Sequence, residues 1–192
     1  MTTNPKLAPG DDAPDFTLPD TNPTTSPGGV GAKTVSLADV LKGRRGALVI
    51  WMCNHCPYVV GSATRIAGLA YEYMPKGLGV VGICSNDAST HPEDSAEKMA
   101  EYAAKWRLPF PYLRDESQEA ARAYGAERTP EIFLLDAAGV CVYEGAIDDS
   151  PKDAIAVKDQ PLRDAIEDLL AGKPVRRPQV ASIGCTIKWK QG

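Results

Sequence analysis

The residues best suited to chemistry are two cysteines, Cys53 and Cys56, which are separated by Asn54 and His55 and followed directly by Pro57. Residues three positions apart on a helix have Cβ atoms about 5–6 Å apart, which is close enough for a disulfide after a small adjustment. If a helix forms here, the pair can therefore cycle between a dithiol and a disulfide. The spacing predicts thiol-disulfide exchange.

The flanking sequence predicts that this pair lies where a buried strand passes into a helix. The continuous apolar run at residues 47–52 is typical of a central strand that is covered on both faces. After it, Val59, Ala63, Ile66 and further apolar residues recur at helical spacing up to Pro75. Pro57 is well placed for the first turn of that helix, because proline is tolerated best there.

The start of a helix favours an anion, because its backbone N–H groups are unpaired and the helix dipole is positive there. This effect lowers the pKa of a nearby thiol. We therefore expect Cys53 to be substantially ionised and to attack, and Cys56, one turn further on, to stay protonated and to resolve the mixed disulfide. His55 can add a hydrogen-bond donor or a positive charge near the thiolate.

The remaining pattern predicts an alternation of strands and helices. Residues 79–84 are expected to form a strand parallel to residues 47–52. Pro92 is expected to open a helix that Pro109 closes, and Asp115 to cap a helix that ends at Gly125. The other predicted elements are an N-terminal β-hairpin of residues 16–18 and 34–36, a strand at 110–113, a hairpin of 132–135 and 140–143, a polar loop at 148–160 and a helix at 161–171. This order implies a mixed sheet with helices on both faces.

Composition narrows the class of protein. A chain of 192 residues suits one domain, here residues 1–192 with an N-terminal extension and hairpin at 1–35 and a tail at 173–192. A formal net charge of −4 gives no basic field for nucleic acid, so we expect no nucleic-acid partner. The sequence contains no recognisable leader and no apolar run long enough for a membrane span. We therefore expect a cytoplasmic protein without a membrane partner, and leave monomer and homodimer both open.

Three further cysteines need separate interpretations. Cys84 and Cys141 lie in apolar strand segments, where cysteine usually behaves as a small hydrophobic residue. Cys185 lies in the tail, either as a third redox thiol that receives the disulfide from Cys53 or simply as a packing residue. Of the other polar candidates, His91 is expected to be a solvated loop residue rather than a catalyst, and Arg128 is expected to be exposed rather than to lend its positive charge to the thiolate.

A zinc site is the main alternative use of the Cys53 and Cys56 pair. Two cysteines with a histidine between them form half of a zinc knuckle, but a structural zinc ion needs four ligands. Only His91 and Cys185 stand out as distant candidates for the rest. We therefore expect neither a metal nor an organic cofactor.

The segment from Trp51 to Pro57, together with Thr129 and Pro130 just before a predicted strand, resembles the thioredoxin superfamily. The sequence CNHCPY and the late segment at residues 184–190 resemble its peroxiredoxin-like branch, of the AhpC/TSA type. The resemblance implies an α/β thioredoxin-like fold, an oxidoreductase, and protein or small-molecule thiols and disulfides as partners. It also implies that Pro130 is cis and faces the dithiol, with supporting residues Trp51, Asn54, His55, Pro57 and Thr129.

The sequence departs from the two family patterns at positions that matter for the reaction. Ala47 stands where thioredoxin has a buried aspartate, so an acid that accepts the Cys56 proton has to come from elsewhere in the chain. The peroxiredoxin pattern P-x-x-x-T-x-x-C, aligned on Cys56, meets Val49 and Cys53 at its proline and threonine positions. Thiol-disulfide exchange is therefore the leading hypothesis. A thiol peroxidase using the same cysteines and a non-enzymatic binding module of the same fold are the alternatives.

Overall fold

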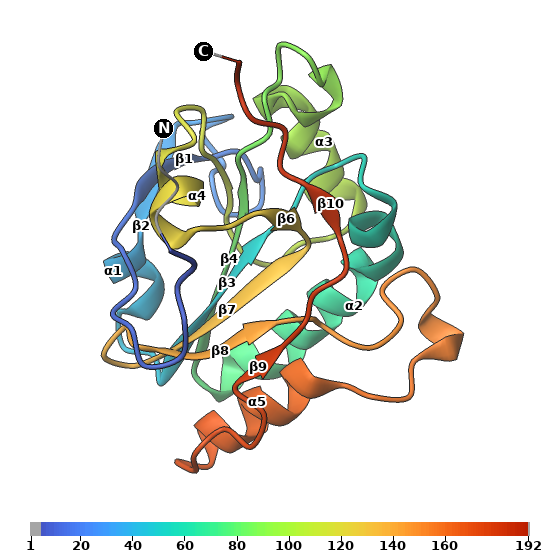
Figure 1. Cartoon of the computed structure of the whole chain (residues 1–192). Coiled ribbons are helices and arrows are strands. Elements are labelled where there is room, and N and C mark those ends of the chain that lie inside the picture. Colours follow the sequence, from blue (N-terminus) through green and yellow to red (C-terminus); the bar gives the residue numbers. More distant parts are fainter. Residues whose placement is uncertain (1–4, 192) are drawn as a thin grey trace.

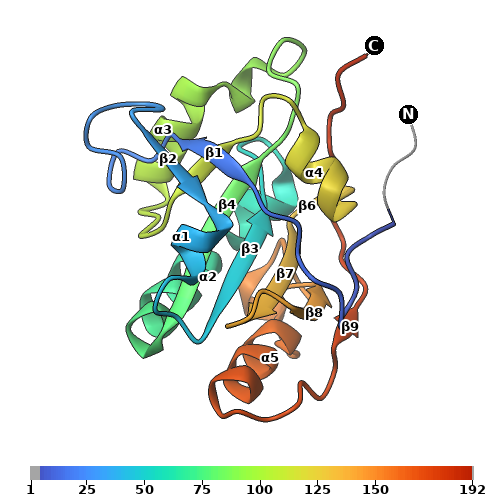
Figure 2. The ribbon, with the colours of Figure 1, turned by 90° about the vertical axis from the view of Figure 1, so that its left-hand side faces the viewer.

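An eight-stranded mixed sheet forms the centre of the computed structural model, which describes residues 5–191. The strand order is β2-β1-β5-β4-β3-β7-β8-β9, and Figure 2 shows β1 and β2 at one end of this sheet and β8 and β9 at the other. The strands are β1 (Thr17–Asp20), β2 (Lys33–Ser36), β3 (Gly46–Trp51), β4 (Leu78–Cys84), β5 (Tyr112–Arg114), β7 (Glu131–Asp136), β8 (Cys141–Gly145) and β9 (Gln179–Val180).

Helices cover both faces of the sheet, as predicted (Figure 1). One face carries α2 (Pro57–Tyr73), α3 (Ala96–Lys105) and α5 (Pro161–Leu170), and the other carries α1 (Leu37–Leu41) and α4 (Glu119–Tyr124). Three short 3₁₀ segments complete the helical part: η1 (Met74–Lys76), η2 (Pro92–Asp94) and η3 (Ala154–Ala156). The fold is thioredoxin-like.

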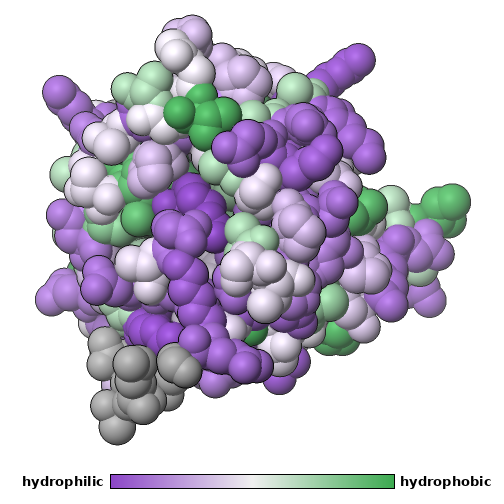
Figure 3. Space-filling model, turned by 90° about the horizontal axis from the view of Figure 1, so that it is seen from above, coloured by the Kyte–Doolittle hydropathy of each residue, from purple (hydrophilic) through white to green (hydrophobic). Residues whose placement is uncertain are grey.

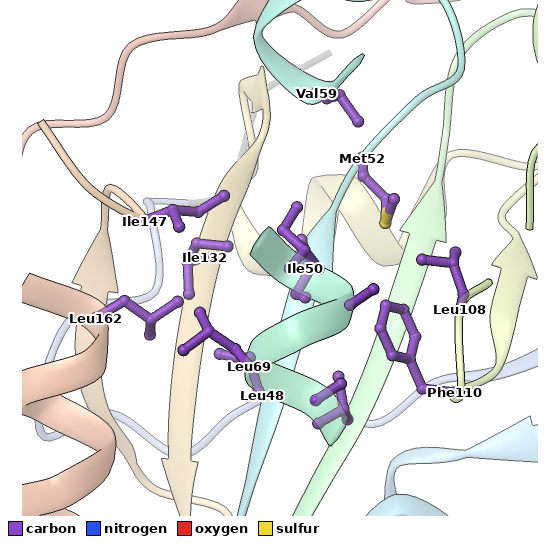
Figure 4. Close-up of a cluster of buried hydrophobic side chains, with 14 of the residues drawn as sticks. Leu48, Ile50, Met52, Val59, Leu69, Leu108, Phe110, Ile132, Ile147 and Leu162 are labelled. Atoms are coloured by element: carbon purple, nitrogen blue, oxygen red, sulfur yellow. The ribbon is translucent and has the colours of Figure 1, made fainter. Parts of the chain in front are cut away.

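The alternation of side chains along β3 explains the two layers of core. Successive side chains of a strand point to opposite faces, and both faces of this sheet are covered by helices, so every residue of β3 is buried. Leu48 and Ile50 pack with α2, α3 and α5, whereas Ala47 and Val49 pack with α1 and α4. Figure 4 shows the first of these clusters, in which Ile50 lies between Met52 of the following loop and Ile132 of β7.

Three predicted units are confirmed. β3 and β4 are parallel neighbours joined through α2, with Ala47 opposite Gly79. β1 and β2 form the expected antiparallel N-terminal hairpin. β7 and β8 form the second hairpin, in which Gly139 takes a positive φ of 85° that glycine adopts without strain.

Two predicted helix starts were wrong. Pro92 opens only the 3₁₀ segment η2, and α3 begins at Ala96 because the Ser95 side chain accepts from the Lys98 backbone N–H as an N-cap. The second error concerns α4, whose N-cap residue is Gln118. Asp115 is instead a buried acceptor for the Ala121 backbone N–H and the Ser85 hydroxyl.

The tail contains two short strands that the sequence pattern did not reveal. β9 pairs in parallel with β8 at the edge of the large sheet. β10 (Cys185–Thr186) pairs antiparallel with β6 (Arg128–Thr129) in a separate two-stranded ladder. Figure 1 shows the tail as a red ribbon that runs past β8 and then past β6. Among the described residues, no helix has the length and apolar character needed to span a membrane.

Candidate active site

The Cys53 and Cys56 pair lies in the connection between β3 and α2, as expected. β3 ends at Trp51, and α2 begins at Pro57, the first helical residue. Cys56 is the N-cap residue of α2, with an extended backbone at φ −66° and ψ 123°. Cys56 is therefore nearer to the helix N-terminus than Cys53, which is the reverse of the expected placement.

Both thiols are almost completely buried, with exposed fractions of 1% for Cys53 and 0% for Cys56. Thr129 contacts both of them. Its hydroxyl lies 3.2 Å from Cys53 Sγ, and its carbonyl oxygen lies 3.1 Å from Cys56 Sγ. The peptide bond between Thr129 and Pro130 is cis, so the predicted cis-proline loop beside the dithiol is confirmed.

A third sulfur completes the site, because Cys185 Sγ lies 2.9 Å from Cys56 Sγ. The ladder between β10 and β6 produces this contact by placing Cys185 directly opposite Thr129. Of the two roles considered for Cys185, the redox role named Cys53 as its partner, whereas the sulfur that Cys185 contacts is that of Cys56. The tail approaches from the side of the helix N-cap, where Cys56 lies.

The electrostatic roles of the two cysteines also differ from the prediction. The hydrogen bond with Cys53 is the main cause that lowers the pKa of Cys56 to about 4, and burial only partly opposes it. Hydrogen bonds from Cys185 and from the Val59 backbone N–H at the start of α2 lower this pKa further. The same bond to Cys56, followed by burial and the negative charge of Asp94, raises the pKa of Cys53. The negative charge therefore belongs on Cys56, and Cys53 keeps its proton.

Asp94 is the site residue that the sequence pattern missed. It is completely buried, and its carboxylate accepts from the Asn54 backbone N–H at 2.7 Å and from the Asn86 side-chain amide at 2.7 Å. His55 Nδ1 lies 2.8 Å from the same carboxylate, at ion-pair distance but outside hydrogen-bond geometry. A buried acid thus lies close to the dithiol, although Ala47 of β3 stands where thioredoxin has its buried aspartate.

Asn54 and Pro57 hold the loop that carries the cysteines. The Asn54 amide donates to the Glu93 carbonyl at 2.7 Å and accepts from the Tyr112 hydroxyl at 3.0 Å. Asn54 is completely buried. Together with Pro57 at the first helical position, it fixes the path of the chain through the site. The signal for Asn54 in the sequence was only its place inside the motif.

The other predicted site residues lie away from the sulfurs. Trp51 packs against Tyr124 and Phe133 on the opposite face of the sheet, because side chains alternate along β3, so its supporting role is corrected. Arg128 is exposed, as expected. Cys84 and Cys141 are buried, and burial is the main cause that raises the pKa of each thiol to about 12.

Three groups in this site could share a metal ion. Ligand atoms of Cys53, His55 and Asp94 lie within 4.8 Å of one another, the one such group of three found in the described part of the chain. The two distant residues considered as further zinc ligands, His91 and Cys185, have other neighbours. The His91 ring stacks on His55 with 5.3 Å between ring centroids, and Cys185 contacts Cys56.

The fold and the paired thiols beside a cis-proline define an oxidoreductase of the thioredoxin superfamily. The family profile described as Redoxin matches residues 8–160. A Mycobacterium tuberculosis protein whose name assigns it provisionally to the peroxiredoxins is 30% identical over 81% of this chain and 88% of its own length. The chain therefore belongs to the Redoxin family and to its peroxiredoxin-like branch.

Two solved structures are similar over nearly the whole chain. An uncharacterized conserved protein from Geobacillus kaustophilus is 43% identical, with a TM-score of 0.86 over 97% of this chain and 94% of that one. A hypothetical protein from Sinorhizobium meliloti is 39% identical, with a TM-score of 0.87 over 98% of each chain.

Proposed function

We propose that this protein is a thiol-disulfide oxidoreductase that exchanges two electrons between the Cys53 and Cys56 dithiol and disulfides of proteins or small thiols. The observation that carries the proposal is that both sulfurs, which precede α2, contact Thr129 of β6. Two thiols that share one neighbour and are hydrogen-bonded to each other can close a disulfide with little movement. A reducing, cytoplasmic setting remains part of this proposal.

In the reductive direction, the Cys56 thiolate attacks one sulfur of the substrate disulfide, and the other sulfur leaves as a thiolate that takes up a proton from water. The Cys53 thiol then loses its proton and attacks Cys56, and the second substrate thiol leaves. The dithiol is oxidised to a disulfide, and the substrate gains two electrons and two protons. Asp94 and His55, whose ligand atoms lie within 4.8 Å of Cys53 Sγ, can take part in this proton transfer.

The experiment is disulfide reduction of insulin, driven by dithiothreitol, in the wild type and in variants. We expect net reduction to be lost in Cys56→Ser and in the double variant Cys53→Ser/Cys185→Ser, which keeps Cys56 alone, and to persist in the matched control Cys141→Ala, whose cysteine lies in β8. Because the charge lies on Cys56, the double variant should accumulate a mixed disulfide with the substrate and Cys56→Ser should not. A wild-type rate equal to that of Cys56→Ser would rule the proposal out.

Peroxide reduction is the second candidate, because a relative at 30% identity carries a peroxiredoxin name and Cys56 holds the charge that peroxide attack requires. Against it, the threonine position of the peroxiredoxin pattern is Cys53. Rapid-mixing measurements of hydrogen peroxide consumption separate the two reactions. Consumption that is fast and independent of Cys53 would favour the peroxidase, whereas slow consumption with rapid insulin reduction would favour disulfide exchange.

Direction of electron flow is measured by titrating the pair against glutathione. Each ~30 mV in midpoint potential corresponds to about 1.4 kcal/mol of preference for the dithiol over the disulfide. Stabilisation of the Cys56 thiolate favours the reduced form, so we expect a pair that is more oxidising than a dithiol with ordinary pKa values.

Elemental analysis of the purified protein tests the alternative of a metal-binding module.

A further inference from the structure

Cys185 is the only one of the three neighbouring thiols that is partly exposed. Cys53 and Cys56 lie beneath the surface with exposed fractions of 1% and 0%. Cys56 interacts with both Cys53 and Cys185. Cys56 is therefore the shared neighbour of the other two sulfurs, and Cys185 is the member of the three that reaches the surface.

The contact between Cys185 and Cys56 is fixed by backbone pairing on both sides of it. Before Cys185, the tail is held by β9, where Val180 pairs with Gly145 of β8. After it, the Ile187 backbone N–H donates to the Glu127 carbonyl at 2.9 Å, and the Ile187 side chain is buried. Two groups held in reacting geometry have a very high effective concentration, because little entropy is lost when they react.

The residue before Cys185 has to be glycine for the tail to come this close. A Cβ atom on Gly184 would lie 2.5 Å from the Thr129 carbonyl oxygen, inside any normal contact distance. The backbone of the tail thus packs directly against the backbone of the cis-proline loop, with no room for a side chain at residue 184. Cys185 also lies beyond residue 160, where the match to the Redoxin profile ends, so the profile assigns it no role.

We propose that Cys185 is a relay thiol that carries the disulfide of the buried Cys53 and Cys56 pair to the surface; this proposal rests on the proposed function. The Cys185 sulfur attacks Cys56 Sγ in the oxidised protein. The bond between Cys53 and Cys56 breaks, a bond between Cys56 and Cys185 forms, and Cys53 takes up the proton that Cys185 gives up. No electrons enter or leave the protein in this step.

An external dithiol then completes the cycle at the surface. One of its thiolates attacks Cys185 Sγ, Cys56 leaves as a thiolate, and a mixed disulfide forms on Cys185. The second external thiol attacks the external sulfur of that mixed disulfide and releases Cys185 as a thiol. The external dithiol is oxidised by two electrons, and all three cysteines of the protein are reduced.

The charge distribution gives the relay a direction. In the reduced protein, burial and then the interaction with Cys56 raise the pKa of Cys185 to about 11, so Cys185 stays protonated. Once Cys56 is bonded to Cys53, its negative charge is gone and one cause of this raised pKa is removed. Cys185 therefore ionises more readily when the buried pair is oxidised, which is when its attack is needed.

The first test is disulfide mapping of Cys53→Ser after treatment with oxidised glutathione. We expect a bond between Cys56 and Cys185 in most molecules, found by peptide mapping without reduction. Glutathione retained on Cys56 beside a free Cys185 would overturn the relay. Gly184→Ala in the same background keeps both thiols but moves the tail away from Thr129, and we expect it to lower the yield of this bond.

The second test is single-turnover reduction of the oxidised protein by dithiothreitol or by a thioredoxin. Loss of the exposed relay should slow reduction of the buried disulfide in Cys185→Ser by about tenfold or more, whereas Cys141→Ala should match the wild type. An unchanged rate in Cys185→Ser would overturn the relay and leave the proposed function intact. Failure of the wild type to form any disulfide between Cys53 and Cys56 would overturn both.

Discussion

His55 Nδ1 and the buried carboxylate of Asp94 lie 2.8 Å apart, and the same carboxylate accepts the backbone N–H of Asn54 inside the dithiol loop. Asp94 belongs to η2, which lies between β4 and α3. A segment distant in the sequence thus supplies a buried acid near the dithiol, whereas thioredoxin supplies its buried aspartate from the central strand. This relationship makes Asp94 the residue whose substitution most directly tests how the loop is held.

Asp94→Asn should destabilise the protein by about 1–3 kcal/mol. An amide at this position keeps one acceptor, but its NH2 group has to face either the Asn54 N–H or the Asn86 amide, both of which are donors. Denaturation by urea measures the loss. The exposed neighbour Glu93 provides the matched control, and Glu93→Gln should change stability by no more than about 0.5 kcal/mol. Equal effects of the two substitutions would contradict this account of Asp94.

The same Asp94→Asn variant should make Cys53 more reactive. The charge of Asp94 contributes to the raised pKa of Cys53, after the larger effects of Cys56 and burial. Removing that charge lowers the pKa of Cys53, so its thiolate fraction at a given pH rises. Iodoacetamide alkylation of Cys53, followed by mass spectrometry in a Cys56→Ser background, gives the rate. A slower rate than in the parent protein would contradict the expected sign.

Thr129 can be tested without disturbing the cis-proline loop. Its hydroxyl lies 3.2 Å from Cys53 Sγ and lowers the pKa of that thiol. Thr129→Val keeps the shape and removes the hydroxyl, so it should raise the pKa of Cys53 and slow closure of the disulfide. Thr129→Ser keeps the hydroxyl and should behave like the wild type. Closure is followed by quenched alkylation after addition of an oxidant, and identical rates in Thr129→Val and Thr129→Ser would contradict a role for this hydroxyl.

Cys56 should be the one cysteine of the site that ionises in the acidic range. Its pKa is lowered to about 4, whereas those of Cys84 and Cys141 are raised to about 12. Ultraviolet absorbance of the thiolate should therefore show a single titration below neutral pH. Cys53→Ala, which removes the main hydrogen bond to Cys56, should shift this titration upwards. Cys53→Ser keeps a donor and should shift it less, and a titration unaffected by either substitution would refute the assignment.

Lys6 supports the segment that precedes Thr129 through its ion pair with Glu131. Its ammonium lies 2.5 Å from the buried Glu131, which also accepts the backbone N–H of Glu127 and of Arg128. Lys6→Met leaves the Glu131 carboxylate without this partner and should cost roughly 1–3 kcal/mol in urea denaturation at neutral pH. The exposed Lys42 offers a control, since Lys42→Met should be nearly neutral.

The Lys6 contribution should depend on pH in the alkaline range. Partial burial lowers the pKa of Lys6, but its bonds to Glu131 and Glu144 outweigh this and raise the pKa above its ordinary value. A group whose pKa is raised by folding stabilises the protein below its unfolded pKa and loses that effect as pH rises through the folded pKa. The stability difference between wild type and Lys6→Met should therefore shrink only at alkaline pH. If the stability difference instead became smaller as the pH was lowered from the alkaline range to neutral, the raised pKa of Lys6 would be contradicted.

The elements predicted from local pattern were those in which neighbouring residues decide the structure. Apolar runs identified β3 and β4, and the helical recurrence after Pro57 identified α2. The two wrong helix starts have different causes. Ser95 rather than Pro92 starts α3 because its hydroxyl accepts the nearby Lys98 backbone N–H, which is a local contact. Asp115 instead accepts from the Ser85 hydroxyl of a distant segment and from the Ala121 backbone N–H.

The motifs pointed to Cys53, Cys56 and Pro130 but not to Asp94, and the positions of the two cysteines relative to the helix differ from those expected. The dithiol and the cis Pro130 follow from motifs that can be read within a few residues. The charge on Cys56 depends first on Cys53, and also on Cys185 in the distant tail and on the start of α2. Asp94 reaches Asn54 from another loop. Trp51 shows the converse, because the period-two alternation of β3 turns it to the far face although it is next to the motif.

The cover that β10 provides over β6 also bears on solubility. Polar and apolar residues are mixed over the end of the molecule seen from above, with apolar side chains in small patches (Figure 3). A chain that ended at Val180 would keep the eight strands of the large sheet but would leave the backbone groups of β6 unpaired beside reactive sulfurs. Unpaired strand edges invite pairing with other chains. We therefore expect truncation after Val180 to increase aggregation, with disulfide bonds between molecules, because β6 loses its partner strand beside the sulfurs.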